Sequence, residues 1–319
     1  MNILVTGCAG FIGFHLSSYL LKKNINVIGI DNINDYYDVN LKKNRLKLLK
    51  IYKNFSFNKF DLINKKKLDL IVKKHQIKII IHLAAQAGVR YSIINPNSYY
   101  KNNLEVFFNI LEISRINKIK HLIYASTSSV YGDNNNFPLK EIENTSRPLS
   151  FYAATKKSNE VMAHSYSEIY KLKVTGLRFF TVYGPYGRPD MALYKFAKSI
   201  YDNKQVELFN KGNHIRDFTY IDDIIESIYK ILNKKNNKLY NIINIGNGNP
   251  VNLINFIKEI ENYIGKKLKF KKINIQKGDV YKTHASITKL YKLINFKPKT
   301  STKTGIKKFL DWYNQYYKK

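Results

Sequence analysis

A glycine-rich stretch near the N-terminus decides the fold. It reads GCAGFIG at residues 7–13 and follows the apolar run ILV at residues 3–5. A turn of this kind between a strand and a helix brings backbone N–H groups against a pyrophosphate, and the helix N-terminus adds a partial positive charge. Gly7 and Gly10 let the backbone turn and approach closely, and Gly13 lets the helix pack on the sheet. The stretch therefore predicts a dinucleotide-binding site after the first strand.

An acidic residue supports this interpretation and favours one cofactor. Asp31 follows a second strand-like run, residues 26–30. A carboxylate at this place accepts hydrogen bonds from the adenosine ribose and repels a 2′-phosphate, so we expect NAD rather than NADP. A plain tight turn is the alternative, because isolated glycine patterns are common.

Strand-like and helix-like runs alternate over the first 180 residues. The strand-like runs are residues 3–6, 26–30, 55–60, 77–83, 121–126 and 173–179, and the helical ones are residues 11–23, 41–52, 65–75, 96–117 and 151–170. Repeated strand–helix–strand units predict an α/β fold with a doubly wound parallel sheet of the Rossmann type.

The order changes after residue 180. A Gly/Pro-rich loop covers residues 184–189, and a last helix is expected at residues 304–317. We predict a dinucleotide-binding domain at residues 1–180, with return segments near 217–250. Residues 181–216 and 251–319 are expected to form a smaller C-terminal α/β domain for the substrate.

Composition limits the class of protein. Apolar residues make up 44% and charged residues 24% of the 319 residues, which excludes wholesale disorder. The single cysteine excludes a disulfide framework and a cysteine-based metal cluster, and the His, Asp and Glu spacings predict no metal site. No run is long and apolar enough to span a bilayer, and no signal peptide is recognisable. We expect a cytoplasmic protein with no membrane partner.

The net charge of +31 raises the question of a nucleic-acid partner. Only seven of the 54 basic residues are arginines, and the lysines are spread along the chain rather than gathered in one stripe. Asn, Ile, Tyr and Phe are also abundant, which together with lysine indicates A/T-rich codons. We therefore expect no nucleic-acid partner. The rival, a non-catalytic nucleotide-sensing or nucleic-acid-binding protein, would be recognised by a gel shift at physiological salt.

Three residues have the chemistry of a proton-transfer site. Tyr152 and Lys156 lie four apart on a predicted helix and so share one face. A free tyrosine titrates near ~10, and a neighbouring ammonium favours the phenolate. Thr127 follows the predicted strand at residues 121–126, at an edge where ligands bind in open α/β sheets. The alternatives are a surface Tyr/Lys pair and a strand-end turn with capping hydroxyls.

Further motifs share a pattern with a known family. They are YAATK at residues 152–156, HLAAQAGVR at 82–90, ASTSSVYG at 125–132, RFFTVYGP at 178–185, RDFTYIDD at 216–223, DNINDYYD at 31–38 and GRPDMA at 187–192. Together with the glycine turn they resemble the extended short-chain dehydrogenase/reductase superfamily, and within it the bacterial and plant UDP-glucuronate 4-epimerases. The resemblance covers nearly the whole chain. Cys8 and Tyr186 depart from the usual alanine and tryptophan, but neither replaces a reacting group.

The resemblance implies C4 epimerisation of UDP-glucuronate to UDP-galacturonate through a 4-keto intermediate. Tyr152 would take the 4-OH proton with help from Lys156 and Thr127, while NAD accepts and returns the hydride. Ser128 and Ser129 stand where related dehydratases and decarboxylases carry acidic residues. A serine is neither acid nor base at neutral pH, which argues against elimination and decarboxylation. The alternative is a 4-epimerase of a neutral or N-acetylated UDP-hexose.

The resemblance also implies the binding residues. For NAD they are Gly7, Gly10, Phe11, Ile12, Gly13, Asp31, Asn32, Lys42, Asp61, Leu62, Leu83, Ala84, Ala85, Gln86, Ser126, Tyr152, Lys156 and Phe179. For the UDP-sugar they are Arg90, Thr127, Ser128, Ser129, Tyr152, Thr181, Arg188, Arg216 and Asp279. Relatives that use neutral sugars usually have Asn at the position of Thr181, so Thr181, with Arg188 as cationic neighbour, is expected at a C6 carboxylate, and Arg216 at the diphosphate. A surface ion pair is the alternative for each arginine.

Four further expectations concern single residues and assembly. Arg178 is grouped with the arginines that bind anions, since it lies in one of the motifs. His82, on an apolar strand, is expected to be a core histidine, and Cys8 a packed small residue rather than a reactive thiol. The protein is expected to be a homodimer, with the helices at residues 96–117 and 151–170 at the interface between the two copies.

Overall fold

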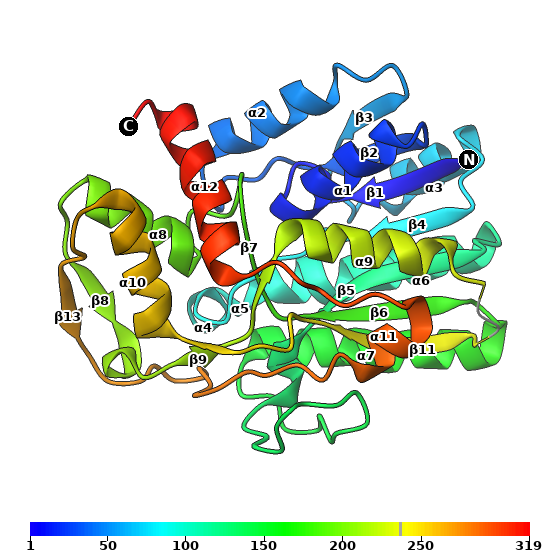
Figure 1. The fold of residues 1–319 in the computed structure, drawn as a ribbon. Helices are drawn as coiled ribbons and strands as arrows, with labels where there is room; N and C mark the ends of the chain where they lie inside the picture. Colours follow the sequence, from blue (N-terminus) through cyan, green and yellow to red (C-terminus); the bar gives the residue numbers. More distant parts are fainter. Residues whose placement is uncertain (236–237) are drawn as a thin grey trace. The chain divides into compact units, whose positions relative to one another are not determined.

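The strand that precedes the glycine turn lies inside a seven-stranded sheet. The computed structural model describes residues 1–235 and 238–319, and its sheet has the order β11-β6-β5-β4-β1-β2-β3 (Figure 1). The strands are β1 Asn2–Thr6, β2 Asn26–Asp31, β3 Phe55–Lys59, β4 Ile79–His82, β5 His121–Thr127, β6 Val174–Phe179 and β11 Tyr240–Ile245. Neighbours from β3 to β6 pair in parallel. The predicted doubly wound α/β fold is confirmed.

The strand order changes direction at β1, which creates a switch point. From β1 the chain moves outward to β2 and β3, then crosses back to β4 and continues to β5 and β6. Because such crossovers are right-handed, the connections on the two sides of β1 place their helices on opposite faces of the sheet. The helical segments here are α1 Phe11–Lys22, α2 Val39–Leu49, α3 Lys65–Lys74, α4 Tyr91–Ile94, α5 Pro96–Tyr99, η1 Tyr100–Glu105, α6 Val106–Ile116, η2 Ser128–Tyr131 and α7 Phe151–Tyr170. Ligands bind outside the carboxyl ends of the strands at a switch point of this kind.

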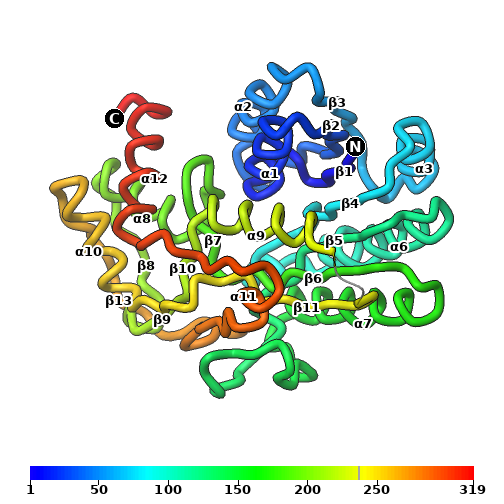
Figure 2. Tube along the Cα trace, turned by 45° about the vertical axis from the view of Figure 1, so that its right-hand side comes forward, coloured from blue at the N-terminus to red at the C-terminus, as the bar shows by residue number. Residues whose placement is uncertain are grey.

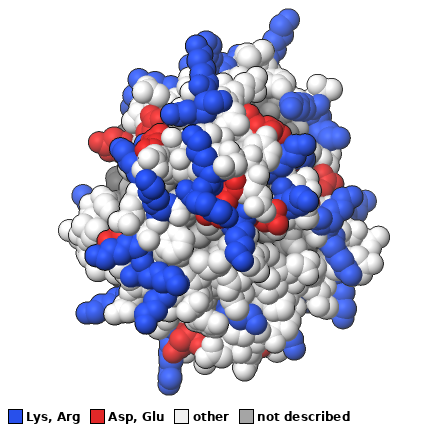
Figure 3. Space-filling model, turned by 60° about the vertical axis from the view of Figure 1, so that its left-hand side comes forward, with Lys and Arg blue, Asp and Glu red and all other residues white. Residues whose placement is uncertain are grey.

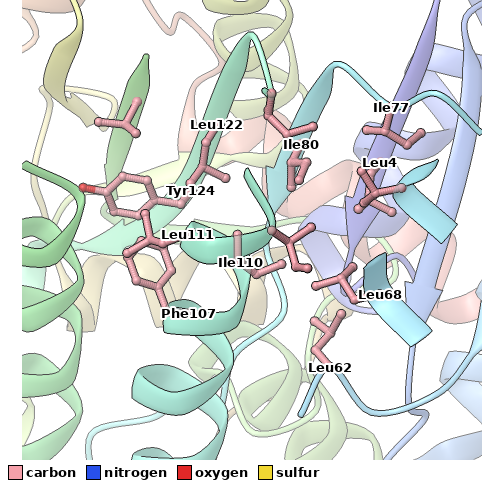
Figure 4. Close-up of a cluster of buried hydrophobic side chains, with 14 of the residues drawn as sticks. Leu4, Leu62, Leu68, Ile77, Ile80, Phe107, Ile110, Leu111, Leu122 and Tyr124 are labelled. Atoms are coloured by element: carbon pink, nitrogen blue, oxygen red, sulfur yellow. The ribbon is translucent and has the colours of Figure 1, made fainter. Parts of the chain in front are cut away.

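A buried apolar cluster joins one face of the sheet to its helices. Leu4 and Ile80 point from β1 and β4 toward Leu68 of α3 and toward Phe107 and Ile110 of α6 (Figure 4). All five side chains are buried, and removal of such surface from water contributes about 25 cal/mol per Å². The cluster holds the strand ends, and therefore the loops that follow them, in fixed positions.

Two predicted helices differ from the observed ones for local reasons. The helix expected at residues 41–52 begins at Val39, because the Asp38 side chain accepts a hydrogen bond from the Asn40 N–H at 2.8 Å and caps it. The single helix expected at residues 96–117 consists of α5, the π-helix η1 and α6. The π-helical turn contains Asn103, and such turns are frequent at functional sites.

The chain divides into two compact units. The first comprises Met1–Asp133, Glu143–Phe179 and Leu232–Ile243, and the second Asn134–Ile142, Phe180–Ile231 and Asn244–Lys319. The second unit contains the short strands β7 Thr181–Tyr183, β8 Val206–Leu208, β9 Ile215–Arg216, β10 Phe218–Tyr220, β12 Val251–Asn252 and β13 Phe270–Lys272. Its helical segments are α8 Ala192–Tyr201, η3 Phe209–Gly212, α10 Leu253–Ile264, α11 Thr288–Ile294, α12 Thr302–Tyr317 and all but the last two residues of α9 Ile221–Asn233.

The unit bounds differ from the predicted domain bounds in two respects. Asn134–Ile142, predicted within the first domain, groups with the second unit, where Leu139 pairs with Ala285. Of the predicted return segment at residues 217–250, only Leu232–Ile243 groups with the first unit. The reason is strand pairing: β11 lies beside β6 in the large sheet, as the trace in Figure 2 shows, whereas β10 pairs in parallel with β7 of the second unit. The Gly/Pro-rich loop at residues 184–189 and the last helix, α12, lie where the sequence predicts them.

Basic side chains are scattered over the face of the protein that Figure 3 draws. The face drawn in Figure 3 carries separate lysine and arginine side chains with acidic groups between them, rather than one basic stripe. No helix in the described part of the chain is both long and apolar enough to cross a membrane.

Candidate active site

The glycine turn has the geometry that an anion-binding turn requires. Gly7 has a φ of +71°, and a Cβ on it would lie 2.8 Å from the Ala84 nitrogen. A Cβ on Gly13 would lie 2.0 Å from the Gly7 oxygen, so neither position accepts a side chain. Helix α1 starts at Phe11, and its N-cap, Gly10, has no side chain to occupy the first N–H groups. These groups and the helix dipole fit the pyrophosphate of a dinucleotide.

The Asp31 carboxylate binds the glycine turn directly. Its Oδ2 accepts a hydrogen bond from the Ala9 N–H at 3.0 Å, and its Oδ1 accepts one from the Ile33 N–H at 2.8 Å. Next to it, the Asn32 side-chain amide donates to Asp61 Oδ2 at 3.0 Å, which joins the ends of β2 and β3. Asp31 therefore supports the turn in addition to its predicted contact with the ribose.

Two basic residues of α2 reach the same region. The Lys42 ammonium donates to the backbone and side-chain oxygens of Asn34, both at 2.6 Å, and so holds the loop after β2. Arg45, which the sequence interpretation missed, is fully buried and donates from Nη1 to the Ala9 carbonyl at 2.8 Å and to the Tyr37 hydroxyl at 2.7 Å. The only sequence signal for it is its spacing of three from Lys42 on one helix.

The residues after β4 border the glycine turn on its other side. The Leu83 N–H donates to the Thr6 carbonyl at 3.2 Å, and the Ala84 N–H donates to the Thr6 hydroxyl at 3.2 Å. His82 is buried and bonded to the same hydroxyl at 2.8 Å, and burial lowers its pKa to about 3. The prediction that His82 is a core histidine is confirmed.

A buried asparagine, Asn103 of η1, ties the β4 end to α7. It accepts from the Gln86 N–H at 2.8 Å and donates to the Gln86 carbonyl at 3.0 Å and to the Thr155 hydroxyl at 3.0 Å. The sequence interpretation missed it, because an asparagine inside a helical pattern carries no signal of its distant partners.

The predicted Tyr/Lys pair lies on α7 at the carboxyl edge of the sheet. Helix α7 joins the parallel neighbours β5 and β6, so it runs antiparallel to them and its first turn, with Tyr152, lies where β5 ends. The Lys156 ammonium donates to the Ala125 carbonyl at 3.0 Å, and burial lowers the pKa of Lys156 to about 8. Tyr152 precedes it by one turn on the same face.

Thr127 is the last residue of β5, as the sequence predicts for a residue at a strand end. Its hydroxyl accepts from the Ser129 N–H at 3.2 Å and donates to the Ser129 hydroxyl at 3.2 Å. Ser128 and Ser129 form the first turn of η2 and are half-buried. The three hydroxyl groups are thus clustered at the end of a central strand, with no acidic side chain among them.

Arg178 requires a correction. The sequence interpretation grouped it with anion-binding arginines, but it is buried in the sheet and forms a bidentate pair with Glu160 of α7, with both hydrogen bonds at 2.8 Å. Burial by itself would lower the pKa of Arg178, but the hydrogen bonds and the negative charge of Glu160 raise it. Glu160 Oε1 also accepts from the Ser126 hydroxyl at 2.7 Å. The pair therefore fixes α7 to β5 and β6.

The other predicted residues of the first unit lie along the same edge. Phe11 and Ile12 begin α1, Leu62 follows Asp61, Ala85 follows Ala84, and Phe179 ends β6. Arg90 is exposed at the start of α4. Cys8 is fully buried, and burial, followed by the charge of Asp31, raises the pKa of its thiol, as expected for a packed residue.

The second unit holds the remaining predicted residues. Arg216 and Asp279, 63 positions apart, meet through an Nη2–Oδ1 bond of 2.9 Å. Arg216 also donates to the carbonyls of Val280 and Tyr281 at 2.7 and 2.9 Å, and His214 lies 3.1 Å from its Nη2. His214 is buried, and burial and the Arg216 charge lower its pKa. The sequence interpretation missed it.

Thr181 and Arg188 form hydrogen bonds with different partners. Thr181 begins β7 and its N–H donates to the Asp217 carbonyl at 3.1 Å. Arg188 forms a bidentate pair with Asp190, at 3.0 and 2.5 Å, within its own loop. Burial disfavours a charged Asp190, but Arg188 lowers the pKa of that carboxyl. Among the described residues, no group of three or more His, Cys, Asp or Glu side chains is placed to hold a metal ion.

Comparison with known proteins finds relatives that match almost the whole chain. A UDP-glucuronate 4-epimerase from Thermodesulfobacterium geofontis is 44% identical over 310 residues, which cover 97% of this chain and 95% of that protein. The crystal structure of UDP-glucuronic acid 4-epimerase from Bacillus cereus in complex with UDP-glucuronic acid and NAD matches with a TM-score of 0.94 and 35% identity, over 99% of this chain and 100% of that one. A Tyr-to-Phe mutant of the same enzyme, in complex with UDP-4-deoxy-4-fluoro-glucuronic acid and NAD, matches with a TM-score of 0.94 and 34% identity, at the same coverage.

The family model that matches covers residues 3–246, from the first strand to the residue that follows β11. This range contains the glycine turn, Thr127 and the Tyr152–Lys156 pair. The chain belongs to the NAD dependent epimerase/dehydratase family.

Proposed function

We propose that this protein is an NAD-dependent UDP-glucuronate 4-epimerase, which interconverts UDP-glucuronate and UDP-galacturonate. The observation that carries the proposal is the set of groups at one sheet edge: Tyr152 and Lys156 on the first turns of α7, and three hydroxyl residues, without an acid, at the end of β5. This set supports proton transfer at one carbon and offers no acid for elimination. The relatives described above carry the same activity in their names.

In the proposed reaction the chain's own groups move one proton. Bound NAD supplies reversible oxidation at C4. Tyr152 accepts the 4-OH proton as a phenolate, which Lys156 stabilises by charge, and Thr127 orients the hydroxyl. Because Lys156 is buried and fixed to the Ala125 carbonyl, its charge acts with little screening by water. Reversal of the same steps from the other face of the 4-keto sugar yields the epimer.

We divide the binding roles between the two units as the sequence suggests. In the first unit the turns after β1 to β4 bind NAD, and Arg90, Ser128 and Ser129 contact the substrate. In the second unit Arg216 binds the diphosphate, Asp279 assists it, and Thr181 and Arg188 recognise the C6 carboxylate. Arg216 has the donors for a diphosphate, since it already binds a carboxylate and three carbonyl oxygens.

A product analysis tests the function directly. Purified protein is incubated with UDP-glucuronate, and the sugars are resolved by NMR. We expect UDP-galacturonate with no net consumption of NAD. Conversion of UDP-glucose or UDP-N-acetylglucosamine alone would instead favour the alternative, a 4-epimerase of a neutral or N-acetylated UDP-hexose.

Asp31→Asn is expected to relax the preference for NAD over NADP. Asparagine keeps an acceptor for the Ala9 N–H but removes the charge that repels a 2′-phosphate. We take the lost repulsion to equal one charge-assisted hydrogen bond, about 1.5–3 kcal/mol. The ratio of the NADP and NAD dissociation constants then changes by about 10- to 150-fold. The measurement is NAD and NADP affinity by calorimetry. Asp35→Asn, in the same loop but exposed, is the control and should leave the ratio unchanged.

Arg188→Ala is expected to lower kcat/KM for UDP-glucuronate by about 10- to 150-fold and for UDP-glucose far less. The reason is the loss of one charge-assisted bond to the C6 carboxylate. Wild type should use UDP-glucuronate far better than UDP-glucose. Kinetics with both sugars on both proteins measure this.

Two controls separate carboxylate binding from support of the loop. Asp190→Asn removes the partner of Arg188 but leaves the guanidinium, so it should affect UDP-glucuronate less than Arg188→Ala does. Arg147→Ala removes an exposed arginine outside the predicted site. If Arg188→Ala and Asp190→Asn damage both sugars equally, Arg188 only supports its loop.

We also propose a homodimer and a cytoplasmic location. Apolar side chains are exposed at intervals of eight on the two helices expected to pair: Tyr100 and Phe108 on η1 and α6, and Val161 and Ile169 on α7. Such patches mark interaction surfaces, and a second copy of the same face would cover them. Sedimentation velocity tests the dimer, and a monomer at micromolar concentration would contradict it. The location follows from the proposed use of NAD and a nucleotide sugar, and cell fractionation tests it.

A further inference from the structure

We propose that Tyr36 and Tyr91 close a ring of contacts at the glycine turn and determine how slowly NAD is released. The proposal rests on the proposed function, in which one NAD would be reduced and then reoxidised in each turnover and would stay bound. Neither tyrosine is among the predicted site residues. All of the residues concerned belong to the first unit.

The topology places two loops on either side of the glycine turn. Strand β1 lies between β2 and β4, and the three strands are parallel, so the segments that follow them leave the sheet at one edge. The segment after β2 contains residues 32–38, here called the β2 loop. The segment after β4 contains residues 83–90, here called the β4 loop, and leads into Tyr91 of α4.

Both loops begin in contact with the turn. On the β2 side, the Ala9 N–H of the turn donates to Asp31 at 3.0 Å. On the β4 side, Ala84 donates to Thr6 at 3.2 Å and lies so near Gly7 that a Cβ there would clash. The glycine turn is therefore bordered by the start of each loop.

Further along, the two loops meet. The rings of Tyr36 and Tyr91 have centroids 4.9 Å apart with an interplanar angle of 47°. Tyr91 in turn packs near the fully buried Tyr99, at 6.2 Å between centroids, and Tyr99 near Tyr152 at 6.0 Å. The Tyr36–Tyr91 contact thus completes a ring that passes from the turn along both loops and is anchored on buried structure.

The β2 loop is held in the shape that presents Tyr36. Ile33, a β-branched residue, has a φ of +53°, a strained conformation that persists only where surrounding bonds impose it. Those bonds are the Ile33 N–H to Asp31 at 2.8 Å and the two 2.6 Å bonds from Lys42 to Asn34. The contact with Tyr91 is therefore made by a preorganised loop rather than by a mobile one.

This arrangement explains retention of a cofactor at the turn. With its pyrophosphate at the first N–H groups of α1, NAD would leave the edge of the sheet only after the two loops part. Loss of one ring removes an aromatic pair and the apolar surface that it buries, which we expect to raise the release rate about 10-fold or more.

The test measures release of NAD from the holoenzyme without any sugar present. Holoenzyme is mixed with excess isotopically labelled NAD, and exchange is followed by mass spectrometry after rapid gel filtration. Tyr36→Ala and Tyr91→Ala should each exchange about 10-fold faster than wild type. The double variant should exchange no faster than either single one, because both substitutions break the same contact. Tyr36→Phe and Tyr91→Phe keep the rings and should exchange at the wild-type rate.

Wild-type exchange rates in the alanine variants, or effects that multiply in the double variant, would overturn the proposal. Where an alanine variant does not fold, hydrogen exchange of the wild type gives the second measurement. Saturating NAD should then slow hydrogen exchange in the β2 and β4 loops together. Slower exchange in only one of the loops would contradict the proposed ring of contacts. Because no sugar is used, failure here is distinct from failure of the epimerase assay.

Discussion

Tyr152→Phe is expected to lower kcat by about 10²- to 10⁴-fold while NAD and UDP-glucuronate still bind. The substitution deletes only the phenol oxygen, which the proposed mechanism uses as the proton acceptor. The half-buried ring, with its edge contact to Tyr99, is retained, so packing should survive. Steady-state kinetics and calorimetric titration of both ligands measure the two effects.

The matched control for this substitution is Tyr166→Phe. Tyr166 lies on the same helix, and its hydroxyl donates to Glu112 at 2.8 Å, on a part of α7 that no predicted site residue occupies. It should lose about 0.5–1.5 kcal/mol of stability and keep its turnover. Turnover near the wild-type level in Tyr152→Phe would mean that another group takes the proton.

Glu160→Gln is expected to lower the free energy of unfolding by about 3–5 kcal/mol, since it leaves the Arg178 charge buried without a carboxylate. The two side chains are only 1% and 3% exposed. Because the pair holds α7 against β5 next to Thr127, turnover of the folded variant should fall as well. Urea unfolding followed by circular dichroism gives the first quantity, and kinetics below the transition give the second.

A double-mutant cycle and an exposed pair provide the controls. Glu160→Gln combined with Arg178→Gln leaves neither member of the pair charged, so it should cost clearly less than the sum of the two single substitutions. Asp69→Asn breaks the Asp69–Lys73 pair, whose side chains are 25% and 60% exposed, and should cost less than about 1 kcal/mol. A Glu160→Gln cost as small as that of Asp69→Asn would show that the buried pair is not essential for α7.

Local patterns in the sequence determined the fold class and the reacting groups. The glycine turn could be predicted because its three glycines, the strand before it and the helix after it follow one another directly within residues 2–22. Tyr152 and Lys156 could be paired because a helix places residues four apart on one face. The alternation of apolar runs likewise predicted the parallel sheet and, with it, the edge at which Thr127 lies.

Only the tertiary structure decided which distant residues meet. Glu160 with Arg178, Arg216 with Asp279, Asn103 with Gln86 and Tyr36 with Tyr91 pair across chain separations that no periodicity encodes. For this reason Arg178 was wrongly grouped with the anion-binding arginines. Its motif does not show that α7 places the Glu160 carboxylate beside it. The tertiary structure also decided which charged side chains are buried. A buried charge is stable only beside its partner, and the order of the strands in the sheet determines which partner is available.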